Sequence, residues 1–369
     1  MEINKTITLV SNNYWTLYKF RFDVIKLFIS KGYKVNLIAK RDAFHTKFSG
    51  EEIKKYFIPI NERGMNIFSE FNTFISLYKI YKKIKTDIIF HFTIKPNIYG
   101  SIIANFLHIK SISFVTGVGH LFLKKESTLK NLIILMYKFA LKKNLEVWFT
   151  NEDDKKIFER NRIILEQKTN IVPGAGVIFK DIDKKKQKTN TTVFLMIARI
   201  QKAKGVVEFL NAAYEYKNND QIQFILIGTH DADDPDCVEL NYMKKYIDNK
   251  SISYHGYKDN IDSHLASASC IIHPSYREGL STVMVEAAAF KKPIITTEVP
   301  GCIDIIPDES YGILCKPRNT SSLKKAIKRF LSLNDNKKES MVEKTYNYVK
   351  NNFDRKKILA IYESTLEYI

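Results

Sequence analysis

The sequence contains few cysteines and no long apolar segment. Four cysteines in 369 residues, with no Cys-x-x-Cys spacing, are too few for a disulfide scaffold. The longest runs without a charged residue are 14 residues, at 96–109 and 263–276, whereas a bilayer-spanning helix needs about 18 to 20 apolar residues. The N-terminal segment lacks the basic, apolar and small-residue regions of a secretory signal. We therefore expect a cytoplasmic protein without a transmembrane helix. The cysteines are expected to be small residues of the core.

Apolar residues are abundant. Hydrophobic residues make up 45% of the chain and charged residues 27%, which excludes a largely disordered, collagenous or coiled-coil protein. A chain of 369 residues is longer than one hydrophobic core usually organises. Two domains of ordinary size are expected.

Acidic residues are scarce in the first half of the chain. Residues 1–180 hold 30 Lys and Arg against 15 Asp and Glu, and residues 181–369 hold 28 against 25, so the net charge of +18 divides into +15 and +3. This asymmetry predicts a polyanionic partner, namely nucleic acid, anionic lipid headgroups or a phosphorylated substrate. A compositional bias toward Ile, Asn and Lys is the alternative explanation for part of the lysine excess.

Short apolar or β-branched runs alternate with stretches of helical period in the first half. The expected strands are 7–10, 35–39, 56–60, 87–92, 111–115, 146–150 and 170–172. Two stretches, 16–31 and 66–85, place apolar side chains on one helical face, with Phe20, Val24, Leu27 and Phe28 in the first and Ile67, Phe71, Phe74, Tyr78 and Tyr81 in the second. This alternation predicts a doubly wound parallel sheet.

A lysine-rich polar stretch at 180–192 indicates a linker, and a second alternation follows it. Strands are expected at 193–198, 224–228, 252–256, 270–274, 293–297 and 311–315, and helices near 205–218, 236–247, 281–290, 319–332 and 337–350. The prediction is an α/β protein of two facing Rossmann-like domains, 1–178 and 190–352, with a C-terminal helix at about 353–369 packing back on the first. Because open α/β sheets bind ligands beyond the carboxyl ends of their strands, we expect the site in an interdomain cleft.

The clearest chemical pattern follows the expected strand at 270–274. A polar loop carries Glu278, and Ser281 or Thr282 can cap a helix whose second turn carries Glu286. The glycine after Glu278 admits close backbone approach, the helix N-terminus suits a phosphate, and either carboxylate can accept hydrogen bonds from ligand hydroxyls. The pattern indicates a nucleotide-sugar site; a capped core helix with two incidental glutamates is the alternative.

This stretch, YREGLSTVMVEAAAFKKPIITTEVPG, resembles the Glu-x7-Glu signature of the retaining family-4 glycosyltransferases. The resemblance extends to SNNYWTLYKFR, HFTIKPNIYGSIIA, FVTGVGHLF, VPGAGV and ARIQKAKGVVEFL, which occur in the order of that family. It implies the GT-B fold of two facing Rossmann domains. The sequences of these segments resemble those of the subgroup that builds O-antigen, capsule or glycoprotein oligosaccharides on polyprenyl diphosphate.

The resemblance implies roles for residues of the expected second domain. Glu278 would contact hydroxyls of the donor sugar, and Glu286 would contact the ribose. The backbone amides of Gly279, Leu280 and Ser281 would bind the donor diphosphate.

Arg199 and Lys204 follow the expected strand at 193–198, at a spacing where the family has an arginine and a lysine. Two cations at the carboxyl end of a strand can neutralise a diphosphate leaving group as the glycosidic bond breaks. Two solvated side chains among 58 basic residues are the alternative.

The resemblance also implies roles for residues outside these two segments, and each of these roles has an alternative. His120 follows the fifth strand, where related enzymes often place a histidine near the reacting sugar, with His91 as the second candidate; a lone histidine is more often structural. Tyr257 stands where the family packs the nucleotide base, or is ordinary packing. Ser11 and Asn13 replace glycines that often approach the donor phosphates, and would substitute as hydrogen-bond donors.

No cofactor or metal is expected. The acidic run at 231–236 lacks the glycine and the terminal glutamate of a calcium loop and indicates a solvated turn. No Asp-x-Asp motif ends a strand of the first domain. With Arg199 and Lys204 available, the diphosphate needs no divalent ion.

Two helical stretches are basic and amphipathic. Segment 127–144 combines apolar residues with four lysines, and segment 66–85 ends in YKIYKKIK. Such helices can lie on an anionic inner-membrane surface. The alternative is that their apolar stripes are the buried faces of ordinary Rossmann helices.

Together these features predict a retaining glycosyltransferase at the inner face of the cell membrane. It would move a sugar, an N-acetylhexosamine, from a UDP-sugar donor to a polyprenyl-diphosphate-linked saccharide in surface polysaccharide synthesis. One alternative is another GT-B enzyme, such as a nucleotide-sugar 2-epimerase. The other is a basic nucleic-acid-binding protein, for which the sequence offers neither a reading element nor aromatic platforms.

Overall fold

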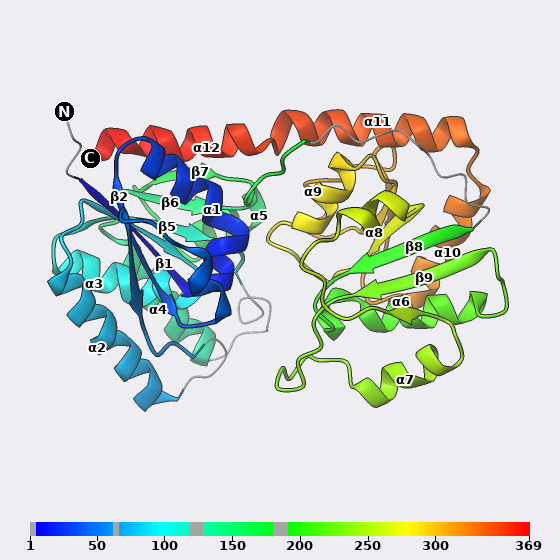
Figure 1. The fold of residues 1–369 in the computed structure, drawn as a ribbon, viewed down its shortest axis with the longest axis horizontal. Helices are drawn as coiled ribbons and strands as arrows, with labels where there is room; N and C mark the ends of the chain where they lie inside the picture. The colour runs from blue at the N-terminus through cyan, green and yellow to red at the C-terminus, as the bar shows by residue number, and fades with distance from the viewer. Residues whose placement is uncertain (1–4, 62–65, 119–127, 180–190) are drawn as a thin grey trace. The chain divides into compact units, whose positions relative to one another are not determined.

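The computed structural model describes residues 5–61, 66–118, 128–179 and 191–369, which form two compact units (Figure 1). The first unit consists of Met1–Ala175 and Lys356–Ile369, and the second of Gly176–Arg355. Each unit is built on one parallel β-sheet. The predicted α/β class, with two domains that are each built on a parallel sheet, is therefore confirmed.

The first unit has a seven-stranded sheet in the order β3-β2-β1-β4-β5-β6-β7. Its strands are β1 (Thr6–Asn13), β2 (Lys34–Lys40), β3 (Ile53–Phe57), β4 (Ile88–Phe92), β5 (Lys110–Val115), β6 (Glu146–Phe149) and β7 (Lys168–Ile171). All adjacent strands are parallel. They overlap the predicted strands, and the apolar runs are buried because helices cover both faces of the sheet.

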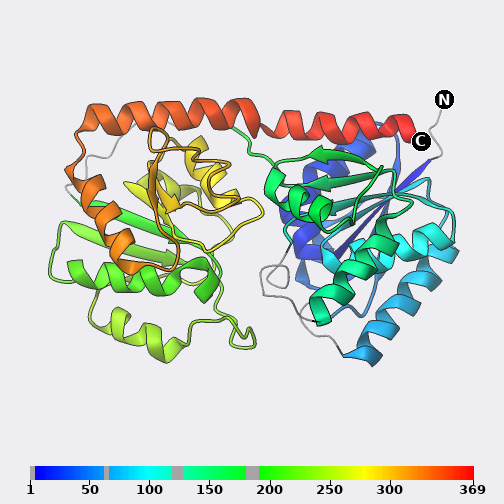
Figure 2. The same ribbon diagram turned by 180° about the vertical axis from the view of Figure 1, so that it is seen from behind.

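Two layers of helices enclose this sheet (Figure 1 and Figure 2). One face packs against α1 (Tyr14–Ser30) and α12 (Arg355–Ser364). The other packs against α2 (Ile67–Lys83), α3 (Ser101–Phe106), α4 (Thr128–Leu141) and α5 (Glu152–Arg160). Because successive strand residues point to opposite faces, Leu9 enters the first core and Val10 the second.

The C-terminal helix α12 completes the core of the first unit. Tyr362 is fully buried, and its ring lies 4.9 Å from that of Trp148 and 5.7 Å from that of Phe90. Beyond the helix, the Tyr368 hydroxyl donates to Glu146, which also pairs with Lys168 at 2.9 Å. Residues at the far end of the sequence therefore stabilise the N-terminal sheet.

The buried face predicted for α2 is wrong in the first turns of the helix. The buried residues are Thr73, Leu77 and Tyr81, whereas Ile67 and Phe71 are 82% and 66% exposed. Two hydrogen bonds set this rotation, since the Thr73 hydroxyl donates to the Pro59 carbonyl (2.9 Å) and the Tyr81 hydroxyl pairs with His91 Nε2 (2.9 Å). A prediction from the spacing of apolar residues takes no account of hydrogen bonds of this kind.

The predicted face of α1 is also displaced. Val24 and Phe28 are buried and Leu27 packs against the same core, as expected, but Arg21 is buried beside them in place of Phe20. The Arg21 guanidinium lies 4.6 Å from the ring centre of Phe92 and 4.8 Å from that of Phe114. Cation–π contact with two buried rings allows an arginine to occupy a position that periodicity assigns to an apolar residue.

The second unit has a six-stranded sheet in the order β10-β9-β8-β11-β12-β13. Its strands are β8 (Thr192–Ile197), β9 (Ile222–Ile227), β10 (Ser253–Tyr254), β11 (Cys270–His273), β12 (Ile294–Thr297) and β13 (Ile313–Cys315). One face packs against α6 (Val206–Ala213), α7 (Leu240–Asp248) and α10 (Thr320–Ser332), and the other against α8 (Asp262–Ser267), α9 (Thr282–Ala289) and α11 (Asp335–Asn352). Each strand overlaps its predicted range.

The structure bears on two expectations from the composition, which concern the cysteines and membrane-spanning helices. The four cysteines are free, and Cys270, Cys302 and Cys315 are buried in the second unit. A bilayer-crossing helix must be long and continuously apolar, and none of the helices in the described ranges meets that requirement.

Candidate functional site in the second unit

The strand order of the second unit reverses at β8. The chain proceeds from β8 to β9 and β10 on one side and then to β11 on the other. Ligands of doubly wound sheets bind outside the carboxyl ends of the strands at such a reversal. The loops that follow β8 and β11 carry most of the predicted site residues.

These two loops are in direct contact. The amide of Tyr276 donates to the carbonyl of Ala203 (2.8 Å). Gly205 has a φ of +75°, and a Cβ at this position would lie 2.1 Å from the carbonyl oxygen of Pro274, so only glycine allows this approach. The contact brings the lysine of the first loop against the glutamate of the second.

Glu278 is the centre of a largely buried ionic cluster. Lys204 Nζ lies 2.7 and 2.8 Å from the two carboxylate oxygens, and His273 Nε2 lies 3.0 Å from Oε1. The side chains of Glu278, Lys204 and His273 are 11%, 18% and 5% exposed. Charges this deeply buried require partners of opposite sign and hydrogen bonds, and each carboxylate oxygen has one.

The cluster keeps the Glu278 carboxyl ionised. Burial alone would raise its pKa, but the Lys204 ammonium and the contact with His273 outweigh burial and hold the pKa well below its usual range. Glu278 therefore offers negative charge and hydrogen-bond acceptors. It is unsuited to act as a general acid near neutral pH.

The acidic run at 231–236 forms a partly exposed turn, as the sequence predicted, but two of its carboxylates also bind the loop after β8. Asp236 Oδ2 accepts from the amide of Ala203 (2.9 Å), and Asp234 Oδ2 accepts from the side-chain amide of Gln201 (2.6 Å). The amide of Lys202 also donates to the Asp236 carbonyl (2.8 Å). These carboxylates hold the loop that carries the cluster's lysine, a contact between segments 33 residues apart.

Helix α9 begins directly after the Glu278 loop. Ser281 is its N-cap, and the hydroxyl accepts from the amide of Met284 (3.4 Å). The positive end of the helix dipole and the amides of its first turn therefore lie beside residues 279–281. Glu286 is half-buried in the second turn of the same helix.

Gly301, in the loop after β12, packs against the backbone of Glu278. Its φ is +80°, and a Cβ at this position would lie 2.4 Å from the Glu278 carbonyl oxygen. The amide of Glu278 donates to the carbonyl of the preceding residue, Pro300 (3.2 Å). The position of the carboxylate therefore depends on this glycine.

We expect Gly301→Ala to lower turnover by roughly 10- to 100-fold, since small displacements of a reacting group have effects of this size. Gly256→Ala is the matched control in the same unit. Both glycines have positive φ (+80° and +64°), so the backbone conformation alone costs about 1 kcal/mol with alanine at either position. A Cβ at 256, however, meets no atom within 4 Å. Values of kcat and thermal midpoints for both variants test this, and equal turnover would contradict it.

The other predicted residues are distributed over both units. Arg199 follows β8 and is exposed. Tyr257 follows the edge strand β10, is 46% exposed, and donates to Asp259 Oδ1 (3.2 Å). Asn13 ends β1, where its Oδ1 caps α1 by accepting from the amide of Thr16 (2.8 Å). His120 lies outside the described residues.

His91 and Ser11 lie in strands β4 and β1 of the first unit. Both are fully buried. His91 pairs with the hydroxyls of Tyr81 (2.9 Å) and Ser101 (3.2 Å). Burial lowers the pKa of its imidazole to about 3, so the ring stays neutral.

Three residues of the site escape inference from the sequence. His273 ends a buried apolar strand, and a polar residue at that position is a signal that could have been used. Asp236 and Gly301 act only through contacts with distant segments, which no local pattern reveals.

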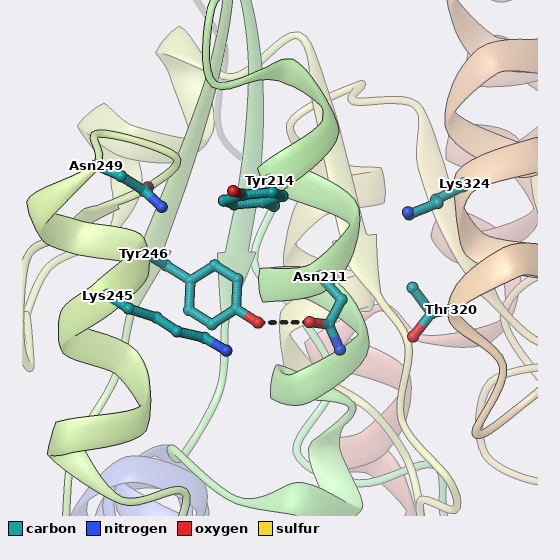
Figure 3. A pocket seen from close by; sticks show the side chains of 7 residues that line it. All are labelled: Asn211, Tyr214, Lys245, Tyr246, Asn249, Thr320 and Lys324. Carbon is teal, nitrogen blue, oxygen red and sulfur yellow. Dashed lines mark hydrogen bonds between the residues drawn. The ribbon is translucent and has the colours of Figure 1, made fainter.

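A pocket on the same unit lies elsewhere, between α6, α7 and α10 (Figure 3). Its volume is about 610 Å³, and the Tyr246 hydroxyl donates to Asn211 Oδ1 within it. The lining residues are Asn211, Tyr214, Lys245, Tyr246, Asn249, Thr320 and Lys324. None of the predicted site residues lines this pocket.

Two doubly wound parallel sheets in one chain are the architecture of the GT-B fold. Residues 6–151 match the family model described as Glycosyl transferase 4-like, and residues 177–348 match the model described as Glycosyl transferases group 1. The chain belongs to this family of glycosyltransferases and is a transferase.

Two curated relatives align over most of their length. The N,N'-diacetylbacillosaminyl-diphospho-undecaprenol alpha-1,3-N-acetylgalactosaminyltransferase of Campylobacter jejuni is 26% identical over 339 residues, covering 86% of each chain. The UDP-Gal:alpha-D-GlcNAc-diphosphoundecaprenol alpha-1,3-galactosyltransferase of Escherichia coli is 26% identical over 322 residues, covering 82% of this chain and 81% of the relative. The names of both relatives include a saccharide on undecaprenyl diphosphate.

Solved structures share the fold over the whole chain. Sucrose-phosphate synthase from Thermosynechococcus elongatus superposes with a TM-score of 0.80 at 17% identity, covering 99% of this chain and 98% of that one. A glycosyltransferase from Rickettsia africae superposes with a TM-score of 0.79 at 20% identity, covering 99% of each.

Proposed function

We propose that this protein is a retaining glycosyltransferase that moves an N-acetylhexosamine from a UDP-sugar to a polyprenyl-diphosphate-linked saccharide in surface polysaccharide synthesis. The observation that carries the proposal is the buried Lys204–Glu278 pair beside the N-terminus of α9. It places hydrogen-bond acceptors for sugar hydroxyls next to a cation for phosphate. The two relatives named for undecaprenyl-diphosphate acceptors support the choice of acceptor.

The donor binds the second unit in this proposal, and the acceptor binds the first. Glu278 accepts hydrogen bonds from the transferred sugar, and Glu286 from the ribose. The amides of residues 279–281 and the dipole of α9 hold the diphosphate, and Tyr257 packs on the base.

Departure of UDP places negative charge on the diphosphate, which Lys204 and Arg199 neutralise. Lys204 is already fixed by Glu278, so little reorganisation is needed as charge develops. The acceptor hydroxyl attacks the face that the diphosphate leaves, and the leaving phosphate takes its proton. These two cations replace a divalent ion.

A donor screen tests the proposed reaction. Purified protein is incubated with a panel of UDP-sugars, with and without a polyprenyl-diphosphate-linked saccharide, and UDP release and glycolipid product are measured. We expect release that depends on the acceptor and is fastest with a UDP-N-acetylhexosamine. Conversion of one UDP-sugar to another without acceptor would instead indicate an epimerase.

The proposed location is the inner face of the cell membrane, reached through the basic surface of the first unit. Lys138, Lys142 and Lys143 are exposed on and after α4. Surface attraction contributes about 1 kcal/mol per basic residue near an anionic bilayer.

Replacing Lys138, Lys142 and Lys143 by Gln should therefore weaken binding to phosphatidylglycerol vesicles by about tenfold or more. Vesicle sedimentation at low salt measures this, and donor hydrolysis should be unchanged. The matched control replaces three exposed lysines of the second unit, Lys244, Lys250 and Lys337. Equal loss of binding in both triple variants would mean that net charge acts without a localised surface.

A further inference from the structure

We propose that α2 and α4 form an apolar surface on the first unit that inserts into the lipid bilayer. We call this the α2–α4 surface. Its residues are apolar and at least half exposed: Ile67 (82%), Phe68 (86%), Phe71 (66%), Leu132 (53%), Leu135 (63%) and Phe139 (66%). Exposed apolar side chains are common singly, but a concentration of this kind marks an interaction site.

The two helices belong to one layer of the unit. Both α2 and α4 pack on α3 and on the turn that precedes it, Pro96–Gly100. Figure 2 shows α2, α3 and α4 together on one side of the sheet. The exposed faces of α2 and α4 therefore lie on the same side of the first unit.

The residues of the α2–α4 surface are not needed for the core. On α4 the buried positions are Ile133, Tyr137, Ala140 and Leu141, and on α2 they are Thr73, Leu77 and Tyr81. Each helix thus has its own inward face, and its exposed apolar face is additional. A helix with two apolar faces buries one in the protein and has the other available for a second apolar phase.

The charges around the surface identify that phase as an anionic bilayer. Lys138, Lys142 and Lys143 are exposed at the end of α4, which contains no acidic residue, and α2 ends with exposed lysines at 82 and 83. The acidic residue of α2, Glu70, is 17% exposed and paired with Lys95. On α4, exposed apolar side chains are therefore flanked by lysines. This is the composition of interfacial helices, which insert beneath the headgroups while their lysines contact anionic lipids. Repulsion between lysines opposes a second copy of the chain as the partner.

This inference rests on the proposed function only in its choice of a membrane as the partner. It differs from docking by charge alone in one measurable respect. Charge attraction is screened by salt within about 8 to 10 Å at physiological ionic strength, whereas apolar burial is not. The α2–α4 surface therefore predicts that part of the vesicle binding survives high salt.

Two sets of variants test the insertion with the full-length protein. Phe68→Ser with Phe71→Ser alters α2, and Leu135→Ser with Phe139→Ser alters α4. The control, Leu240→Ser with Tyr214→Ser, alters apolar residues of similar exposure in the second unit, 51% and 46%. Sedimentation with phosphatidylglycerol vesicles at low and high salt is measured, together with donor hydrolysis and the thermal midpoint.

We expect each of the first two pairs to weaken vesicle binding at least tenfold and to abolish the salt-resistant part, while the control pair binds as the unmodified chain does. Single substitutions report depth directly. Phe68→Trp and Phe139→Trp should be quenched by brominated lipids, and Leu240→Trp should not.

Unchanged binding in the first two pairs, or no added quenching at 68 and 139, would overturn the inference. A dimer in light scattering that the serine variants lose would reassign the surface to a second copy. Absence of sugar transfer in the unmodified protein, with insertion intact, would contradict the proposed function and leave the α2–α4 surface standing.

Discussion

Lys204→Ala is expected to lower kcat by roughly 10²- to 10³-fold, the scale for losing one preorganised charge-stabilising group. Lys204 is held 2.7 Å from the Glu278 carboxylate, so its charge is in place before the diphosphate departs. Lys202→Ala, in the same short turn but exposed, is the control and should retain activity. Equal kcat values for the two variants would contradict the role of Lys204.

Arg199→Ala should show a loss of similar size, and activity of the unmodified protein should survive EDTA. A strict requirement for manganese or magnesium would show that the two cations do not suffice for the diphosphate.

The Lys204 variant separates stability from catalysis. Removing Lys204 leaves the Glu278 carboxylate with His273 as its partner and is expected to destabilise the fold by up to about 3 kcal/mol. The double variant Lys204→Ala with Glu278→Ala removes both charges, so its thermal midpoint should recover while its activity remains low. Residues in contact are expected to be non-additive in this way, and equal recovery of activity would indicate that the pair serves folding alone.

Glu278→Ala is expected to reduce kcat strongly, whereas Glu286→Ala is expected mainly to raise the donor KM. Contacts to the reacting sugar can strengthen in the transition state, but a ribose contact is already complete in the ground state. Steady-state kinetics with a fixed acceptor concentration, and direct titration with UDP, distinguish the two effects.

Glu239→Ala is the control for these substitutions, because Glu239 is exposed and lies in the second unit. It should behave as the unmodified protein does. Unchanged kinetics in both the Glu278 and Glu286 variants would remove the proposed donor site.

Prediction of the fold succeeded where local patterns dominate. The strands of both sheets were visible as apolar runs because parallel strands are buried on both faces. Prediction of helix rotation was less successful. The inward face of α2 is set by hydrogen bonds of Thr73 and Tyr81 to other segments, and that of α1 accommodates Arg21 between two rings. Because the rotation of α2 was predicted wrongly, its exposed apolar residues were expected in the core, whereas the structure places them at the surface.

The sequence by itself determined the class of the protein. Alternating strands and helices specify two doubly wound sheets, and the Glu-x7-Glu stretch with Arg199 and Lys204 specifies where its chemistry is expected, because these signals lie within short segments. Only the tertiary structure decided the partners of Glu278. His273 and Lys204 reach it from different strand ends, Asp236 and Gly301 fix its surroundings, and α12 completes a sheet far away in sequence. Buried charge is stable only when groups from several segments converge on it, and convergence is a property of the folded chain.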